Sequence, residues 1–172
     1  YERRGCTAMR TENEIWRALF GLYFWHEIYE LEGLGLTNEF DHLPASLKTN
    51  QFYEFASKQI ETRLKSTDTK AKLVQQLSLA AMKYYGQGNI VFKWRKNILE
   101  RLILLINHSK LDALLSLLKA MTQDWKNLSD GFPDLMLIEN EALRFEEVKS
   151  EGDQLRRNQL LSIQKLQSLG FD

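Results

Sequence analysis

The chain of 172 residues is long enough to bury one sizeable core, and its 44% hydrophobic and 27% charged residues are ordinary for a globular protein. Its 23 basic and 23 acidic residues cancel, which argues against a protein that coats nucleic acid without specificity. The best membrane candidate, Ile98 to Ile106, is short and contains Glu100 and Arg101, so we expect no membrane contact.

We expect no secretory signal, because the first residues lack an apolar stretch. Cys6 is the single cysteine, which excludes an internal disulfide and a zinc site built of thiolates. Both features favour an intracellular protein, in the cytoplasm or nucleoid of a bacterium or in the nucleus of a eukaryote. Because the chain opens on Tyr1 and not on methionine, we expect it to be a fragment of a longer protein.

The first predicted element is a helix over 11–32. Thr11 and Glu14 have the spacing of a capping box, and apolar residues follow at intervals of three and four. A long connector with several glycines should follow, from Gly33 to Thr49. Periodicity then predicts a run of helices, one of them capped by Asn50 and the others over 68–85, 90–107 and 111–128.

The pattern changes after Asp130. Two short apolar runs, Asp134 to Ile138 and Leu143 to Val148, are separated by a polar turn and predict a β-hairpin. A polar loop then leads to a helix over 153–169, which Gly170 should end. Because a hairpin alone is hardly stable, these strands must pack on helices or join strands that the pattern does not reveal.

The hairpin carries the residues with the most informative chemistry. Asp134 follows Pro133 at the start of one strand, while Glu147 and Lys149 lie two apart on the next strand and should project from the same face. Carboxylates supply the oxygen ligands of Mg²⁺ or Mn²⁺, which polarises a scissile phosphate and lowers the pKa of a bound water. Lys149 would orient that water or offset charge in the transition state. The alternative is a solvated hairpin with an exposed ion pair.

This is the PD…(D/E)xK pattern of restriction-endonuclease-like nucleases, and the flanking residues extend the likeness. Gly-Phe-Pro-Asp-Leu at 131–135 and Phe-Glu-Glu-Val-Lys at 145–149 resemble the VRR-type nuclease domain, and more narrowly the Fanconi-anaemia-associated nuclease family. Thr-Glu-Asn at 11–13 and Leu-Phe-Gly-Leu-Tyr-Phe-Trp at 19–25 resemble the catalytic-helix motif of the same family. Both ends of the chain therefore match it.

The resemblance implies an α/β fold with a restriction-endonuclease-like core and a large α-helical insertion. In these terms residues 1–172 form a single nuclease domain. Its catalytic helix would be 11–32, its helical insertion 50–128, and its hairpin and final helix 130–172.

The resemblance also implies the ligands of the metal. Glu12, Asp134 and Glu147, with the backbone carbonyl of Val148, would hold Mg²⁺ or Mn²⁺, and Lys149 would be the catalytic lysine. The sequence gives Glu12 separate support, because on a helix it would share a face with apolar residues and point inward. A carboxylate that points inward needs a cation or a proton.

Gln159 matches a glutamine in the last helix of the family and is expected to support the metal ligands; a solvated helix residue is the alternative. The chain departs from the family after Lys149, where Ser150-Glu151 and Asp153-Gln154 replace Gly-Pro and Asp-Arg. That change puts one phosphate contact in doubt, and Arg156 and Arg157 are candidates to supply it. No organic cofactor is implied.

A second basic cluster surrounds Trp94 at the expected start of a helix. Lys93, Arg95 and Lys96 are therefore candidates to contact DNA, since phosphates bind basic groups and bases stack on aromatic rings. The alternative is a solvated helix surface. The histidines lack metal-ligand spacing and are expected to be structural.

The resemblance implies a metal-dependent, structure-specific DNA endonuclease and 5′–3′ exonuclease of the 5′-flap type. It would act on branched or flapped DNA, including in interstrand crosslink repair, and leave a 5′-phosphate and a 3′-hydroxyl. Two alternatives stay open: a dimeric Holliday-junction resolvase, and a catalytically inactive helical module that binds DNA or a partner. The long helical segment before Asp134 favours the flap nuclease, and the intact acidic residues and lysine argue against decay. The sequence does not determine the oligomeric state.

Overall fold

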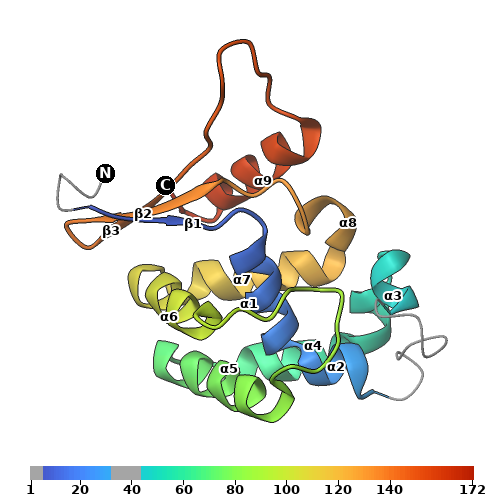
Figure 1. The fold of residues 1–172 in the computed structure, drawn as a ribbon. Coiled ribbons are helices and arrows are strands. Elements are labelled where there is room, and N and C mark those ends of the chain that lie inside the picture. The colour runs from blue at the N-terminus through green and yellow to red at the C-terminus, as the bar shows by residue number, and fades with distance from the viewer. Residues whose placement is uncertain (1–5, 32–43) are drawn as a thin grey trace.

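The computed structural model describes residues 6–31 and 44–172, which form a three-stranded antiparallel sheet beside a larger group of helices (Figure 1). The sheet has the order β1-β2-β3, with β1 at Thr7–Arg10, β2 at Leu135–Glu139 and β3 at Ala142–Glu146. Its first strand thus comes from the start of the chain and its other two from the last third. The end of β1, the start of β2 and the end of β3 lie side by side.

The hairpin of β2 and β3 confirms the predicted pair of strands, with both strands shifted by one or two residues. The expectation that the hairpin joins a further strand is also confirmed, because β1 pairs with β2 from Thr7↔Ile138 to Arg10↔Leu135. The sequence pattern did not reveal β1. Its four residues are Thr-Ala-Met-Arg, in which two apolar residues stand together between two polar ones. The strand is therefore too short and lacks the alternation of apolar and polar residues that predicts a strand.

The helices account for most of the described residues. Their bounds are α1 Glu14–Tyr23, α2 Trp25–Tyr29, α3 Ala45–Lys48, α4 Phe52–Ser66, α5 Lys70–Tyr84, α6 Ile98–His108, α7 Leu111–Gln123, α8 Trp125–Leu128 and α9 Arg157–Ser168. Helix α1 leaves the sheet and runs into the helical group (Figure 1). All of its residues except Glu14 and Arg17 are buried. No described helix combines the length and the apolar character needed to cross a bilayer.

The single helix predicted over 11–32 is wrong at its start and in its middle. Helix α1 begins at Glu14 after the N-cap Asn13, and non-helical backbone at Phe24 separates α1 from α2. The capping box is also wrong, since no side chain caps α1 and Glu14 pairs instead with Arg95 and Arg101. These long-range ion pairs are invisible to a local spacing rule.

Other helix limits differ in the same way. The predicted cap Asn50 lies at φ 66 and the N-cap of α4 is Gln51. Residues 90–97 are not helical, so α6 begins at Ile98, and Asp124 separates α7 from α8. Helix α9 starts at Arg157 and stops as predicted before Gly170, which has a φ of 83. The prediction over 68–85 is confirmed by α5, whose N-cap Thr69 accepts a hydrogen bond from the Lys72 amide.

The expected connector runs from Gly33 to Thr49, and its residues 33–43 lie outside the described part of the chain. Beyond it, the connector prediction is wrong at its end, because α3 occupies Ala45–Lys48.

Aromatic packing joins α1 to the sheet. Trp16 stacks on Phe132 with ring centroids 5.0 Å apart and also contacts Phe145 and Phe171. Such pairs add to the free energy of burial and fix relative orientation. The start of α1 is thereby held beside the start of β2 and the end of β3.

Candidate functional site

The predicted site residues come from three segments that meet at one end of the sheet. Glu12 follows β1, Asp134 precedes β2 and Glu147 follows β3. The amides of Thr11 and Glu12 donate to the carbonyl oxygen of Asp134 at 2.8 and 3.3 Å. Main-chain hydrogen bonds therefore bring residues more than a hundred positions apart into contact.

Asp134, Glu147 and Lys149 lie together as predicted. Asp134 Oδ2 accepts the Val148 amide at 2.9 Å, and Lys149 Nζ lies 3.1 Å from Glu147 Oε1. Glu147 and Lys149 follow β3 rather than lying within it, so their place on the strand was predicted wrongly. Their side chains nevertheless point toward each other.

Gln159, at the start of α9, connects this pair to the helix. Its amide Nε2 donates to Glu147 Oε1, and its Oε1 accepts from Lys149 Nζ at 3.0 Å and from the Arg156 amide at 2.9 Å. One side chain thus contacts the carboxylate and the ammonium together, and its bond to Arg156 anchors it at the first turn of α9. This contact is not that of a solvated helix residue.

The second carboxylate oxygen of Glu147 has no partner in the part of the chain that the structure describes. The Glu147 side chain is only 10% exposed, and its Oε2 is buried without a hydrogen-bond donor among the described residues. Burial of a carboxylate oxygen without compensation is unfavourable. A cation at this oxygen would supply the missing interaction.

Glu12 was predicted to face inward, and that prediction is wrong. It lies before α1 with a φ of 42, its side chain is 46% exposed, and its Oε1 pairs with Arg10 Nε at 2.7 Å. The prediction failed because it assumed that the helix already includes residue 12. In the part of the chain that the structure describes, no three histidine, cysteine, aspartate or glutamate side chains form a group that could hold a metal ion.

Glu12 still lies at the same depression as Asp134. A cavity of about 160 Å³ is lined by both residues and by Arg156 and Gln159. The Arg10 partner of Glu12 is 80% exposed, and such surface pairs contribute little free energy. Turning the Glu12 carboxylate away from Arg10 therefore costs little.

Asp130 organises the same region and was missed by the sequence analysis. Its Oδ1 accepts from the side-chain amide of Asn13 and from the Gly131 amide, and its Oδ2 accepts from Asn158 at 3.2 Å. Asn13 in turn accepts the Phe132 amide at 2.9 Å. These bonds tie the start of α1, the loop before β2 and α9 together. The pattern marked Asp130-Gly131 only as a change between elements.

The basic candidates fall in three places. Arg156 lines the cavity with Asp134, whereas Arg157 lines a different groove beside α7 and α8. Lys93, Arg95 and Lys96 are exposed in the segment before α6, so the prediction that they open a helix is wrong.

The segment before α6 nevertheless lies near the candidate site. Arg95 Nε is 3.2 Å from Glu14 Oε1 at the start of α1. Trp94 donates to the Gln87 carbonyl and packs against Trp25 and Phe92, so its ring is occupied within the protein. Base stacking on Trp94 is therefore not favoured.

The fold and the site define an α/β protein whose small antiparallel sheet gathers carboxylates and a lysine at one end. Residues 69–172 match the VRR-NUC domain, and the chain belongs to this family. The family resemblance seen in the sequence is thereby confirmed.

Similar proteins include relatives named as nucleases, which are several times longer than this chain. The chain is 27% identical to a Fanconi-associated nuclease 1 homolog of Oryza sativa subsp. japonica and 29% identical to one of Schizosaccharomyces pombe. These alignments cover 99 and 100% of this chain but only 18 and 25% of the relatives. The structure is similar to that of paFAN1 bound to 2-nucleotide 5′-flap DNA with a gap, with a TM-score of 0.82, 22% identity, and coverage of 97% of this chain and 31% of that chain. This last likeness establishes the fold.

Proposed function

We propose that this chain is the nuclease core of a metal-dependent, structure-specific DNA endonuclease that cuts at 5′ flaps and degrades ends in the 5′–3′ direction. The observation that carries the proposal has two parts. Asp134 accepts the amide of Val148, between the paired Glu147 and Lys149, and Glu147 keeps a buried carboxylate oxygen without a partner among the described residues. Membership of the VRR-NUC family and the names of the relatives support it. The flap DNA in the paFAN1 complex supports the choice of substrate, and crosslink repair would be its setting in the nucleus or nucleoid.

The donor set fits a divalent cation. Glu12, Asp134, Glu147 and the carbonyl of Val148 would offer oxygen ligands, which suit Mg²⁺ or Mn²⁺. The unpartnered Oε2 of Glu147 supports this assignment, and Glu12 would first leave Arg10. When bound, such an ion acts as a Lewis acid toward the phosphate and the attacking water.

The side chains of the protein would perform the remaining tasks. Lys149, held by Glu147 and Gln159, would donate to a non-bridging phosphate oxygen and offset the charge that develops there. Arg156, at the cavity, would bind the neighbouring phosphate. Lys93, Arg95, Lys96 and Arg157 would extend this contact along the DNA backbone.

In the proposed domain plan, the sheet, α1 and α9 form a restriction-endonuclease-like core. Helices α4 to α8 would be the helical insertion between the residues that follow β1 and those that precede β2. The whole of 1–172 would then be a single nuclease domain.

The experiment compares labelled 5′-flap, four-way-junction and duplex DNA in the presence of Mn²⁺ or EDTA, with wild-type protein and Asp134→Asn. We expect flap cleavage that EDTA abolishes and that Asp134→Asn lowers by at least about a hundred-fold. Asn keeps an acceptor for the Val148 amide, so the folded state should persist. Cleavage that survives both changes would remove the metal site. Cutting of four-way junctions alone would favour a resolvase, and binding without cleavage a non-catalytic module.

A further inference from the structure

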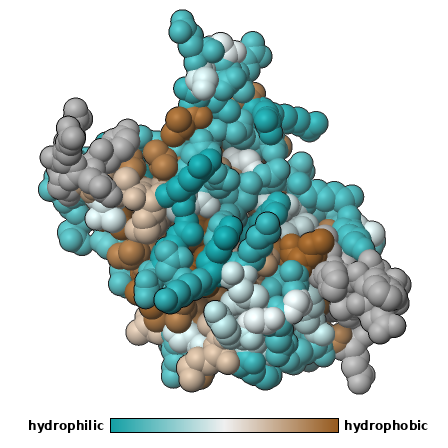
Figure 2. Space-filling model, viewed as in Figure 1, coloured by the Kyte–Doolittle hydropathy of each residue, from teal (hydrophilic) through white to brown (hydrophobic). Residues whose placement is uncertain are grey.

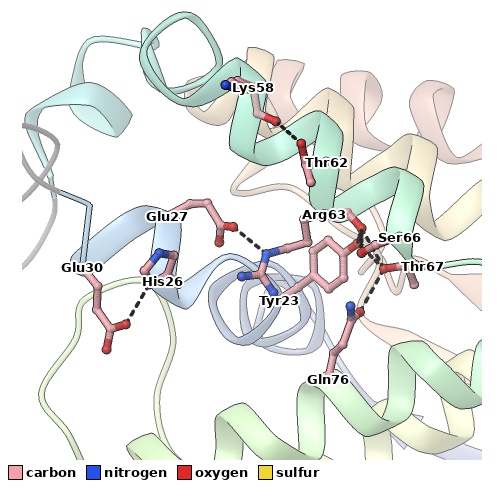
Figure 3. Close-up of polar contacts among 10 residues, drawn as sticks. All are labelled: Tyr23, His26, Glu27, Glu30, Lys58, Thr62, Arg63, Ser66, Thr67 and Gln76. Carbon is pink, nitrogen blue, oxygen red and sulfur yellow. Dashed lines mark hydrogen bonds and ion pairs between the residues drawn. The ribbon is translucent and has the colours of Figure 1, made fainter.

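A polar cavity of about 420 Å³ lies between α2, α4 and α5 (Figure 3). It lies at the Tyr23 end of α1, a ten-residue helix about 15 Å long whose other end carries the candidate active site. All its lining side chains are polar or charged, and they include Glu27, Lys58, Arg63 and Gln76. Its volume is that of a site for a small ligand, and its lining residues offer hydrogen-bond donors and acceptors to a polar one.

Glu27 and Tyr23 hold the guanidinium of Arg63. Glu27 Oε1 accepts Arg63 Nε at 2.6 Å, and Arg63 Cζ lies 5.8 Å from the centre of the Tyr23 ring. The two terminal nitrogens of Arg63 have no hydrogen bond within residues 6–31 and 44–172. The Nε edge of the Arg63 guanidinium is therefore fixed by Glu27, while the N–H groups of its two terminal nitrogens stay available to a ligand.

Two further groups at the cavity lack a partner. Glu27 is only 3% exposed, and its Oε2 is buried without a donor among the described residues. Lys58 is exposed and forms no ion pair in the same part of the chain. The cavity thus offers two cations against one carboxylate, and it also offers one buried acceptor that needs a hydrogen.

We propose that this cavity binds a phosphate monoester or inorganic phosphate. Lys58 and the terminal nitrogens of Arg63 would bind phosphate oxygens, since guanidinium and ammonium groups form strong charge-assisted hydrogen bonds with them. A hydroxyl on the phosphate, or on an attached sugar, would donate to Glu27 Oε2. An internal phosphodiester of DNA has neither a hydroxyl on its phosphate nor a free hydroxyl on the attached sugar, so it would leave Glu27 Oε2 without a donor.

The test follows the ³¹P NMR signal of inorganic phosphate, and in a second arm of a deoxynucleoside monophosphate, during titration with the full chain in EDTA. The variant is Lys58→Gln, which changes an exposed side chain and should fold normally. The matched control is Lys65→Gln, which removes the same charge from an exposed position of α4 that does not line the cavity. We expect saturable binding whose Kd rises about ten-fold in Lys58→Gln and is unchanged in Lys65→Gln.

The two arms identify the source of the phosphate. Similar affinities would assign the cavity to free phosphate, and nucleotide binding tighter by about ten-fold or more would assign it to a nucleotide. Absence of saturation, or equal weakening in both variants, would overturn the proposal. Lys58-dependent binding of a single-stranded oligonucleotide without terminal phosphate, as tight as that of the monoester, would overturn it as well.

Discussion

At the scale of single residues, Gln159 is the side chain on which the geometry of the candidate site depends. Its amide contacts Glu147 and Lys149 together. Loss of this amide should leave both groups free to move and lower kcat by about 10- to 100-fold. Steady-state cleavage by Gln159→Leu measures the effect, and Gln164→Leu on the same helix is the control. Equal rates for the two variants would contradict the assigned role.

Glu30 provides a prediction about pH. Hydrogen bonds from His26, and then from Tyr84 and Lys83, lower the pKa of Glu30 to about 2, below its ordinary value of 4.5. A carboxyl whose pKa is lower in the folded state stabilises that state above pH 4.5, and the contribution is lost as the pH falls toward 2. When the pH is lowered from about 6 to about 2.5, the Tm of Glu30→Gln should therefore fall by less than the Tm of the wild type.

Thermal unfolding at the two pH values measures this difference. Glu54→Gln, which removes an exposed carboxylate from α4, is the control and should follow the wild type. A wild type and a Glu30→Gln variant with the same acid sensitivity would contradict the prediction.

The sequence predicted the pairing of Glu147 with Lys149 but not the orientation of Glu12. The first depends on a local spacing of two residues immediately after β3, and the structure places Lys149 Nζ 3.1 Å from Glu147 Oε1. The second depends on where α1 begins, and two main-chain bonds to Asp134, far along the chain, decide that. A local pattern contains no information about such partners.

At the scale of elements, the loop before β2 packs closely against helix α9. Gly131 has a φ of 81, and a Cβ there would lie 2.5 Å from the main chain of Asn158. Gly131→Ala should cost about 2–5 kcal/mol, from the left-handed backbone and the clash together. Cleavage should fall as well, because α9 carries Gln159.

Gly152 offers a matched control. It has a φ of 90 in the segment that projects between β3 and α9 (Figure 1), and its Cβ would meet nothing within 4 Å. Gly152→Ala should thus cost only the backbone term of about 1–2 kcal/mol. Urea unfolding of both variants gives their free energies of unfolding and so separates the cost of the left-handed backbone from the cost of the clash. Equal losses of free energy in the two variants would show that the contact with α9 is unimportant.

Element limits were predictable where a local signal exists and wrong where tertiary contacts decide. The helix predicted over 68–85 is confirmed by α5, and the stop predicted at Gly170 is confirmed for α9. The segment 90–97 was read as helix because its apolar residues have helical spacing. In the structure Val91 and Phe92 instead pack directly on Gly21 of α1, where a side chain would leave no room.

At the scale of the whole molecule, a bound cation would link the sheet end to α1 and α9. Mn²⁺ at about a hundred times its Kd should stabilise the fold by about 2.7 kcal/mol. For a protein of this size that raises Tm by about 5–10 °C. Glu147→Gln should abolish the increase, and Glu151→Gln in the exposed segment should not. An equal increase in both variants would place the cation elsewhere.

The surface of the molecule is consistent with a polar partner at the site. Residues 148–157 are all exposed, and the projecting segment that contains them is mainly hydrophilic (Figure 2). This segment includes Lys149 and Arg156, so two of the basic groups assigned to the site belong to a stretch that faces solvent. Composition alone could not predict this, because the net charge of zero hides where basic groups gather.

The pairing of β1 with β2 has a consequence for synthesis of the protein. Ala8 pairs with Leu137, so more than a hundred residues must be made after β1 before its partner strand exists. Helices rely on nearby residues and assemble early, whereas such distant pairings form late. A growing chain that ends before β2 would therefore hold helices but not the sheet end that brings Asp134 and Glu147 together.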